Sequence, residues 1–476
     1  MSKQSQVTAP VQAAERAGTG NPRVILAILS LAAFMASLDV FIVNVAFDRI
    51  GESFEGSSLG DVSWVLNAYA IFYAALLVPL GRLADKVGRK QVFLLGLGVF
   101  TAASMACAAA PGLWWLVAFR ILQAAGAAAL TPTSLGLLLA TAPPDRRMPY
   151  VRLWSAVAGI AAAAGPVLGG ILVTASWRWV FLVNLPVGLI ALVAAARAVP
   201  DSRDSRVSRL PDLAGAGLLT TGIGTLALAL VKGGDWGWGD GRTIASFVVA
   251  ALLLAGFVRR AERHPVPVVE PDLYRVRSFA AANVAMITFS IGFAGYLLTV
   301  VLWMQNVWHW STITTGLAVA PGPAIVPVVT VLVQRYCRRV HPGVLTALGC
   351  LAFAAGIIMT LALAGPNGSS YASELLPGQL VSGVGIGLAL PTLLSSATAA
   401  LPAHRTSTGS GVINMTRQIG FVLGVSIVVA ILGVTSTYAT THDAFVHGWW
   451  TLAVIELVAA VACLGLLDRR TRPTGT

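Results

Sequence analysis

Charged residues are scarce in this chain of 476 residues, because Asp, Glu, Lys and Arg make up 11% of it while hydrophobic residues make up 56%. Soluble globular domains carry about a quarter charged residues, so this balance excludes a soluble protein. Long polar stretches are also lacking, and the longest connector expected between apolar runs covers only residues 259–277. No soluble catalytic domain fits there, so the protein must act within the membrane or at its edges.

Cysteine is rare as well, and the four present have no spacing that suggests a metal site: Cys107, Cys337, Cys350 and Cys463. We therefore expect no disulfide, no metal and no cofactor. The six histidines fall in loops or at helix ends, so the sequence offers no catalytic cluster for an intramembrane enzyme. A phosphate-binding loop of the Walker type is also absent, so we expect no use of ATP.

Apolar runs of about twenty residues recur along the chain, and each is long enough for a helix to cross roughly 30 Å of hydrocarbon. The strands of a membrane barrel would be about ten residues long with strict alternation, a pattern that is not seen. We count fourteen runs and predict an all-α polytopic membrane protein with fourteen transmembrane helices. The first run is too long for a signal-peptide core and contains Asp39, so it is expected to be a retained helix.

The runs fall into groups of six, two and six, which predicts two six-helix bundles with an inserted helix pair. Two bundles that rock about a site near the midplane are a general solution for transporters. The expected order is a cytoplasmic tail (1–23), a six-helix bundle (24–200), a loop with the inserted pair at about 211–231 and 243–258 and a following loop (201–277), a second six-helix bundle (278–467) and a cytoplasmic tail (468–476).

Lys and Arg report the topology of a membrane protein. With the N-terminus inside, only Arg49, Arg178, Lys232 and Arg242 fall in outer loops, and most of the 32 basic residues fall in cytoplasmic segments. Both termini are therefore expected in the cytoplasm. The formal charge of +12 needs no nucleic acid as a partner, because the anionic headgroups of membrane lipids suffice.

The connector between the second and third runs, 81–90, reads GRLADKVGRK. It resembles the loop signature of the major facilitator superfamily at Gly81, Asp85, Gly88, Arg89 and Lys90. Gly88 permits a tight turn, Asp85 can accept hydrogen bonds from a helix N-terminus, and Arg89 can bind a carboxylate. We expect a conformational latch between the bundles; the alternative is a set of positive-inside charges that flank a turn.

Further segments resemble the fourteen-helix drug:proton antiporter family and actinobacterial multidrug or antibiotic efflux proteins: 38–46, 120–126, 165–170, 177–186 and 409–420. After Ala46 that family usually continues with Leu-Pro, whereas this chain has Phe47-Asp48, which puts the end of the first helix in doubt. The resemblance implies a monomeric antiporter of the bacterial plasma membrane that exchanges protons for lipophilic drugs or endogenous antibiotics by alternating access. An exporter of lipids or amino-acid-like metabolites, or a proton-coupled nutrient importer, is the alternative.

Residues 165–170 read GPVLGG and resemble the motif associated with exporters. Proline removes one backbone donor and glycine lets a neighbouring helix approach closely. We therefore expect Gly165, Pro166, Gly169 and Gly170 to form an antiporter seam. Ordinary packing between membrane helices is the alternative.

Charges inside the membrane are costly unless they are paired or hydrated. At about 1.5 Å per residue, Asp39 lies about 22 Å from the cytoplasmic end of the first helix, and Arg120 lies about 10 Å from the outer end of the fourth. Because the hydrocarbon core is about 30 Å thick, the two residues lie at nearly the same depth. Gln123 lies one turn from Arg120 on the same face. Movement of Asp39 and Arg120 apart or together would load and release a proton; a permanent structural ion pair is the alternative.

Asn414, Arg417 and Gln418 share one face of the thirteenth helix. From a helix rise of about 1.5 Å per residue, Arg417 lies about 10 Å and Glu456 about 16 Å from the cytoplasmic surface. Their side chains are therefore expected to be within reach of each other. A structural pair is the leading interpretation, and a second proton site at Glu456 is the alternative.

The remaining candidates are residues on helices that face the substrate cavity in this family. They would hold an apolar compound, either aromatic or singly cationic, through contact area and cation–π attraction. The cavity candidates are Tyr69, Tyr73, Gln123, Tyr296, Trp303, Met304, Gln305, Asn414 and Arg417.

Overall fold

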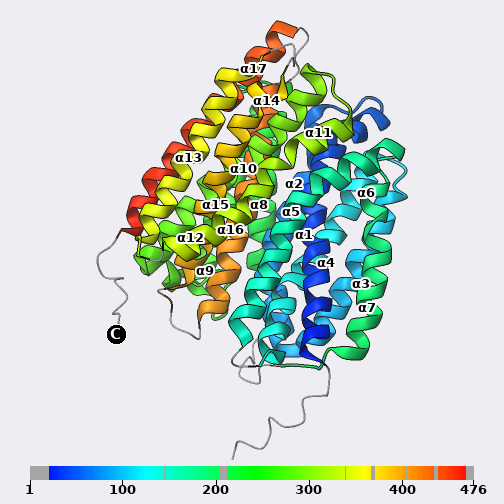
Figure 1. Cartoon of the computed structure of the whole chain (residues 1–476), viewed down its shortest axis with the longest axis vertical. Helices are drawn as coiled ribbons and strands as arrows, with labels where there is room; N and C mark the ends of the chain where they lie inside the picture. Colours follow the sequence, from blue (N-terminus) through cyan, green and yellow to red (C-terminus); the bar gives the residue numbers. More distant parts are fainter. Residues whose placement is uncertain are drawn as a thin grey trace, which may run out of the picture.

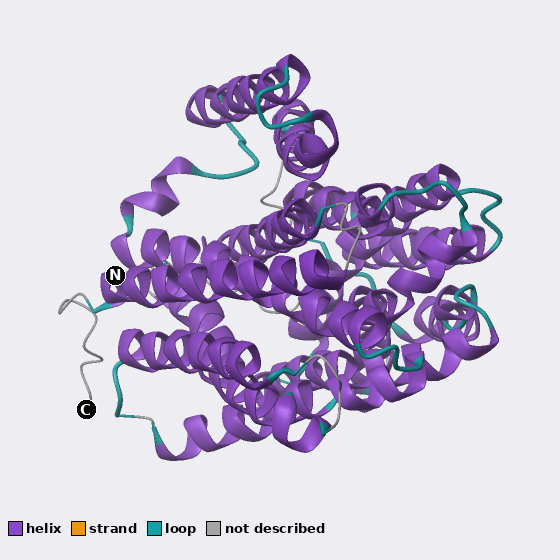
Figure 2. Cartoon of the chain, turned by 90° about the horizontal axis from the view of Figure 1, so that it is seen from above, coloured by secondary structure: helices purple, strands orange, loops and turns teal. Residues whose placement is uncertain are grey.

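A computed structural model describes residues 21–143, 146–203, 212–337, 339–365, 370–399, 401, 405–433 and 438–467. Most of the expected N-terminal tail, all of the expected C-terminal tail and the arginine-rich stretch 204–211 lie outside the described residues. The described residues form helices and no strands (Figure 2). Among the described residues, fourteen helices are long and apolar enough to cross a membrane, which confirms the predicted all-α class and the number of spans.

Helices α1–α7 form the first bundle and lie side by side on the right of Figure 1. Within it α1 packs on α5, and α4 packs on both α2 and α3. The first helix continues past Phe47-Asp48, so the departure from the family sequence does not end it. The bounds are α1 Pro22–Ser53, α2 Leu59–Val87, α3 Arg89–Ala108, α4 Leu113–Thr141, α5 Arg147–Ala175, α6 Trp179–Leu182 and α7 Asn184–Ala198.

The second bundle runs from α10 to the end of the described chain. Its main packing pairs are α13 with α15, α10 with α16, α12 with α15 and α13 with α17. The bounds are η3 Pro271–Arg275, α10 Arg277–Leu302, η4 Trp303–Val307, α11 Thr312–Val319, α12 Pro321–Tyr336, α13 Pro342–Leu363, α14 Tyr371–Glu374, α15 Leu376–Ala399, α16 Thr406–Leu432, α17 Tyr438–Ala462 and η6 Cys463–Leu466. Contacts between the bundles join α2 to α16 and α5 to both α11 and α12.

The inserted pair consists of α8 (Leu213–Trp236) and α9 (Gly241–Arg263). The helix α8 packs on α2 of the first bundle and on α16 of the second, and its Lys232 forms an ion pair with Asp61 of α2 at 2.9 Å. The helix α9 packs on α8 and exposes apolar side chains such as Val248 and Leu252, as a helix that borders lipid would. Within the described part of the chain, α8 is therefore the member of this pair that packs extensively against both bundles.

The two ends of the molecule differ in their charged residues. The end at which α1 begins carries Arg82, Arg89 and Lys90 and is called the basic end below; the opposite end is the far end. At the basic end α2 stops at Gly88, whose φ of 137° is a conformation that disfavours residues with a side chain. At the far end Ser58 caps α2 by accepting a hydrogen bond from the backbone of Asp61. These caps satisfy backbone groups where the helices leave the apolar layer.

Candidate functional site

A buried ion pair joins α1 to α4. Arg120 Nη1 lies 2.5 Å from Asp39 Oδ2, and the two side chains are 1% and 0% exposed. Arg120 Nε also donates to the backbone oxygen of Val65 on α2, at 3.1 Å. This geometry confirms the proximity that the depth of the two residues predicts, although it does not test their role.

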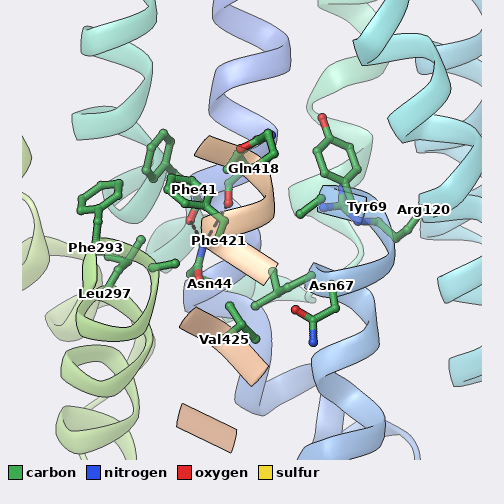
Figure 3. Close-up of a pocket in the computed structure, with 14 residues that line it drawn as sticks. Phe41, Asn44, Asn67, Tyr69, Arg120, Phe293, Leu297, Gln418, Phe421 and Val425 are labelled. Carbon is green, nitrogen blue, oxygen red and sulfur yellow. Dashed lines mark hydrogen bonds between the residues drawn. The ribbon is translucent and has the colours of Figure 1, made fainter. Parts of the chain in front are cut away.

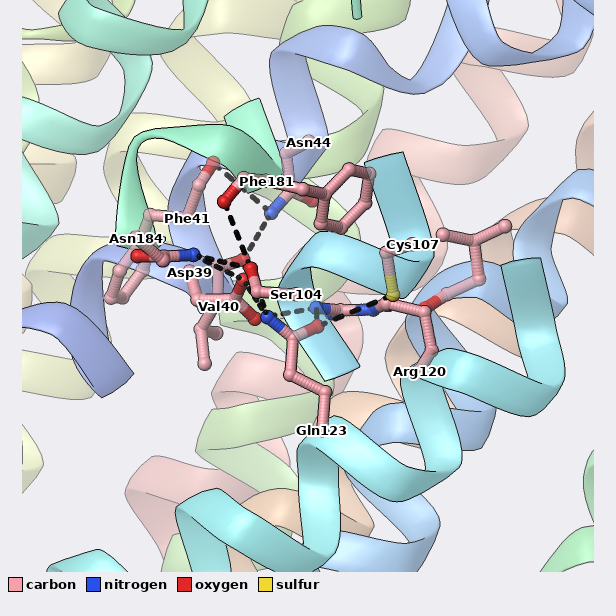
Figure 4. Close-up of polar contacts among 11 residues, drawn as sticks. Asp39, Val40, Phe41, Asn44, Ser104, Cys107, Arg120, Gln123, Phe181 and Asn184 are labelled. Carbon is pink, nitrogen blue, oxygen red and sulfur yellow. Dashed lines mark hydrogen bonds and ion pairs between the residues drawn. The ribbon is translucent and has the colours of Figure 1, made fainter. Parts of the chain in front are cut away.

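Three further polar side chains complete the network around the pair (Figure 4). Gln123 Nε2 donates to Asp39 Oδ1 at 2.8 Å, and Gln123 Oε1 accepts from Arg120 Nη1 at 2.7 Å. Asn184 Nδ2 donates to Asp39 Oδ1 at 3.4 Å and to Ser104 Oγ at 3.0 Å. Asp39 thus accepts hydrogen bonds from three side chains, and the network links α1, α3, α4 and α7.

Two members of this network, Ser104 and Asn184, are absent from the residues proposed from the sequence. Both are buried polar residues within apolar runs, and Asn184 lies in the family-like segment 177–186. Their polarity was the signal that could have singled them out. Residues at the same depth can face any direction around their helices, so depth alone does not show which of them meet.

A cavity lies between the bundles, directly beside this network (Figure 3). Its lining comes from α1, α2 and α4 on one side and from α10 and α16 on the other. Arg120 is one of the lining residues, and its guanidinium carbon lies 4.0 Å from the centre of the Tyr69 ring, which lines the cavity too. The same guanidinium therefore contacts both the buried carboxylate and the cavity wall.

Three phenylalanines form the apolar part of the wall. Phe41 of α1 and Phe293 of α10 have ring centres 6.2 Å apart, and Phe293 lies 5.5 Å from Phe421 of α16. They meet across the boundary between the bundles, so a compound that entered here would contact aromatic rings from both. None of the three was among the candidates from the sequence, because phenylalanine is common throughout membrane helices.

Of the nine predicted cavity residues, all of which the structure describes, Tyr69 lines the cavity and the other eight do not. Tyr73 stacks on Tyr69 and bonds to Thr131 of α4, while Gln123 belongs to the buried network. Asn414 is half-buried and donates to the backbone of Ser410 in its own helix. The expectation that Tyr73, Gln123 and Asn414 line the cavity is therefore corrected.

The residues in the second half of α10 and in η4 that the sequence predicted to line the cavity do not line it either. Tyr296 bonds to Thr360 of α13 at 2.8 Å and is buried in the second bundle. Trp303 and Met304 are fully buried, and Trp303 packs against aromatic residues of α17. Gln305 Nε2 donates to the backbone oxygen of Val45, at 3.2 Å, and so links the two bundles instead of lining the cavity.

The predicted pairing of Arg417 with Glu456 is wrong. Both carboxylate oxygens of Glu456 are buried without a hydrogen-bond partner among the described residues, and the side chain packs against Gly292 of α10. Arg417 instead lies near Tyr73 of α2 and does not line the cavity. The missing side chain at Gly292 gives Glu456 room to turn toward α10, away from α16.

The residues predicted to form the latch make the contacts described here with α2, α4, α7 and the segment that follows α7. Arg89 Nε pairs with Asp85 at 2.7 Å, Lys90 donates to the backbone of Ala196 on α7, and Gly81 packs on Pro132 of α4. Close to Gly88 lies Asp201, which leaves little room for a side chain there. The expected latch between bundles is not made by these residues in this structure.

A neighbouring ion pair at the basic end joins α2 to the connector that leads into the second bundle. Arg82 Nη2 lies 2.7 Å from Glu270 Oε1, and Arg82 Nη1 donates to the backbone oxygen of Pro267 at 3.0 Å. Arg405, just before α16, lies 3.9 Å from the other oxygen of Glu270. Arg82 lies within the segment 81–90 but is not among the residues that the sequence predicts to form the latch.

The glycine-rich segment of α5 packs closely on α1 and on α11, which the seam hypothesis and ordinary helix packing both predict. A side chain at Gly165 would meet Phe41, and one at Gly169 would meet the backbone of Ile42, both on α1. A side chain at Gly170 would collide with the backbone of Thr312, at the start of α11. The segment therefore holds α1 and the far end of the second bundle close to α5.

Comparison with known proteins agrees with this arrangement. The family model described as Major Facilitator Superfamily matches residues 29–425. The chain is 32% identical over 435 residues to the tetracenomycin C resistance and export protein of Streptomyces glaucescens (90% of this chain, 78% of that protein). It is 33% identical over 408 residues to the methylenomycin A resistance protein of Streptomyces coelicolor (85% and 84%).

Multidrug resistance protein Stp of Mycobacterium tuberculosis is 33% identical over 406 residues (84% of this chain, 74% of that protein). Among solved structures, that of the peptide transporter POT in complex with sulfate shares the fold, with a TM-score of 0.69 at 16% identity (94% of this chain, 95% of that chain). The chain therefore belongs to the major facilitator superfamily.

Proposed function

We propose that the protein exports lipophilic drugs or antibiotics across the bacterial plasma membrane in exchange for protons. Membership of the superfamily and similarity to resistance and export proteins for tetracenomycin C and methylenomycin A support transport of such compounds. The glycine-rich seam on α5, which resembles the exporter motif, favours export over uptake. The transporter acts as a monomer within membrane lipid and uses neither ATP nor nucleic acid.

The basic end faces the cytoplasm in this proposal, and both termini lie on that side. The bias of Lys and Arg toward one set of loops supports this orientation. The Arg82–Glu270 contact then closes the cytoplasmic side, and the α5–α11 contact at Gly170 and Thr312 closes the outer side. Alternating access requires these two contacts to open in turn.

Asp39 is the proton site in this proposal, and the observation that carries it is the dual contact of Arg120. When Asp39 is a carboxylate, it holds Arg120 at the cavity wall; when it is protonated, the charge that holds the guanidinium is removed. Protonation of Asp39 therefore changes the shape and charge of the cavity through Arg120, although Asp39 itself does not line the cavity. Glu456 is the second candidate, since its buried carboxylate has no cationic partner among the described residues.

Everted membrane vesicles test this function. The vesicles are acidified inside, a protective compound is first identified by a toxicity screen in an efflux-deficient host, and a pH-sensitive dye then reports protons that leave the lumen when that compound is added. We expect proton release that depends on the protein. Transport that continues after the proton gradient is collapsed, but stops without ATP, would contradict the proposal.

A further inference from the structure

The cavity wall combines aromatic rings with neutral polar groups. Besides Phe41, Phe293 and Phe421, it contains the amides of Asn44, Asn67 and Gln418 (Figure 3). Among the described residues that line it there is no Asp or Glu. The chemistry of the wall therefore limits which compounds can bind.

Three polar atoms around the cavity are buried and have no hydrogen-bond partner among the described residues: Tyr69 Oη, Asn67 Oδ1 and Gln418 Oε1. Asn67 uses its amide nitrogen to donate to Ser426 of α16, at 3.2 Å, which leaves its oxygen free to accept. Buried polar atoms are normally satisfied, because an unpaired one costs free energy. The wall thus offers two acceptors and one hydroxyl that a bound compound can satisfy.

The charge of the wall disfavours a cationic compound. The charged side chain that lines the cavity is Arg120, and it already occupies the face of Tyr69 on which a ligand cation would bind. Asp39 lies outside the lining and accepts bonds from Arg120, Gln123 and Asn184. A cation would therefore lose its hydration in the cavity without gaining a carboxylate partner.

The aromatic rings define the other half of the recognition. Phe41 belongs to the first bundle, whereas Phe293 and Phe421 belong to the second. Offset or edge-to-face contacts with a ring of the ligand would stabilise it between the two bundles. An aromatic compound in this position contacts both of the bodies whose relative movement transport requires.

We propose that the cavity selects neutral aromatic compounds that carry hydroxyl groups and discriminates against cations. The ligand's hydroxyls donate to Asn67 Oδ1 and Gln418 Oε1, and a ligand oxygen accepts from the Tyr69 hydroxyl. Its rings pack on Phe41 and Phe293. This inference names the substrate class of the proposed exporter and rests on that function for its physiological meaning.

Equilibrium dialysis of the purified protein in lipid nanodiscs tests the selectivity with three matched probes. They are a naphthalene diol with one hydroxyl on each ring, its dimethyl ether, and the naphthyltrimethylammonium cation, with empty nanodiscs as the correction for partition into lipid. We expect the diol to bind about tenfold or more tightly than the ether, because the ether leaves the buried acceptors unpaired. We expect the cation to bind more weakly than the diol.

Two variants of the cavity wall show whether the selectivity comes from this cavity. Gln418→Met removes one acceptor at similar volume and should reduce the preference for the diol over the ether severalfold, and Asn67→Leu repeats the test at the other acceptor. Gln379→Met is the matched control, since Gln379 is also buried with both amide atoms unpaired but does not line the cavity. It should keep the full preference.

Three results would overturn the inference: no binding of the diol, an ether or cation that binds at least as tightly, or an unchanged preference in the folded Gln418 and Asn67 variants. The binding assay is independent of the vesicle assay. If the diol binds selectively but no compound drives proton movement, the proposed function fails and the selectivity of the cavity stands.

Discussion

Replacement of Asp39 by Asn is the most direct perturbation of the proposed proton site. The new amide oxygen would still accept hydrogen bonds from Gln123 and Asn184, but the amide nitrogen would face the guanidinium of Arg120, so a donor would oppose a donor. The variant also leaves Arg120, which is 1% exposed, without its counterion. Loss of one partner of a buried ion pair costs about 3–5 kcal/mol.

The double variant Asp39→Asn with Arg120→Gln separates loss of the proton site from loss of stability. It removes the unpaired charge of Arg120 as well as the carboxylate of Asp39. The remaining loss in the free energy of unfolding comes from altered neutral hydrogen bonds and is about 1–3 kcal/mol. We expect its unfolding temperature to lie between those of the wild type and Asp39→Asn. Proton-driven transport should be absent from both variants, because neither has a group that titrates at position 39.

Thermal unfolding in detergent and transport in everted vesicles measure the two effects on the same preparations. Ser104→Ala is the control, since it removes a neutral member of the network and leaves the Asp39–Arg120 pair in place. It should retain proton-driven transport at a reduced rate. Full transport by the folded double variant would refute the reasoning, make Asp39–Arg120 a structural pair, and move the proton site toward Glu456.

Three further predictions concern contacts away from the cavity. Arg82→Glu should increase thiol labelling of an engineered cavity cysteine from the cytoplasmic side, and Glu270→Arg in the same chain should reverse the change; equal labelling in all three proteins would show that the pair does not close that end. Gly170→Leu should reduce export strongly because its side chain would collide with α11, while Gly98→Leu, in open space, should not; similar export by the two contradicts the seam. Glu456→Gln should keep its proton-driven transport in vesicles, because Asp39 is the proposed proton site, and it should keep its fold, because the amide replaces a carboxylate that has no hydrogen-bond partner among the described residues; loss of coupling in the folded variant would identify a second proton site.

The sequence predicted the spans and one buried contact well because both depend on position along a helix axis. The length of each apolar run gives the span, and a rise of about 1.5 Å per residue gives the depth, which brought Asp39 and Arg120 to one level. The rotation of each helix was harder to predict. In a membrane both lipid and protein neighbours are apolar, so the hydrophobic pattern of a helix does not show which of its faces meets another helix. The sequence therefore does not show whether Tyr296 or Trp303 faces the cavity or a neighbouring helix.

The error at Glu456 has the same origin. Its depth matched that of Arg417, but α17 directs the carboxylate toward Gly292 of α10. The absence of a side chain at Gly292 is visible in the sequence, yet its meaning depends on which helix lies opposite. The neighbour of each helix is set by the packing of the whole bundle, and neither composition nor spacing gives it.

The inserted helix α8 contacts the two bundles through different chemistry. Its Lys232 is bound by charge to Asp61 of α2, and Gly60 packs directly on Val231, so α8 is fixed to the first bundle. Its contact with α16 lies beside a small cavity lined in part by Val429 and other small residues of that helix. If the bundles rock as proposed, the contact of α8 with α16 resists sliding less than its ion pair with α2, so we expect α8 to travel with the first bundle and to slide along α16.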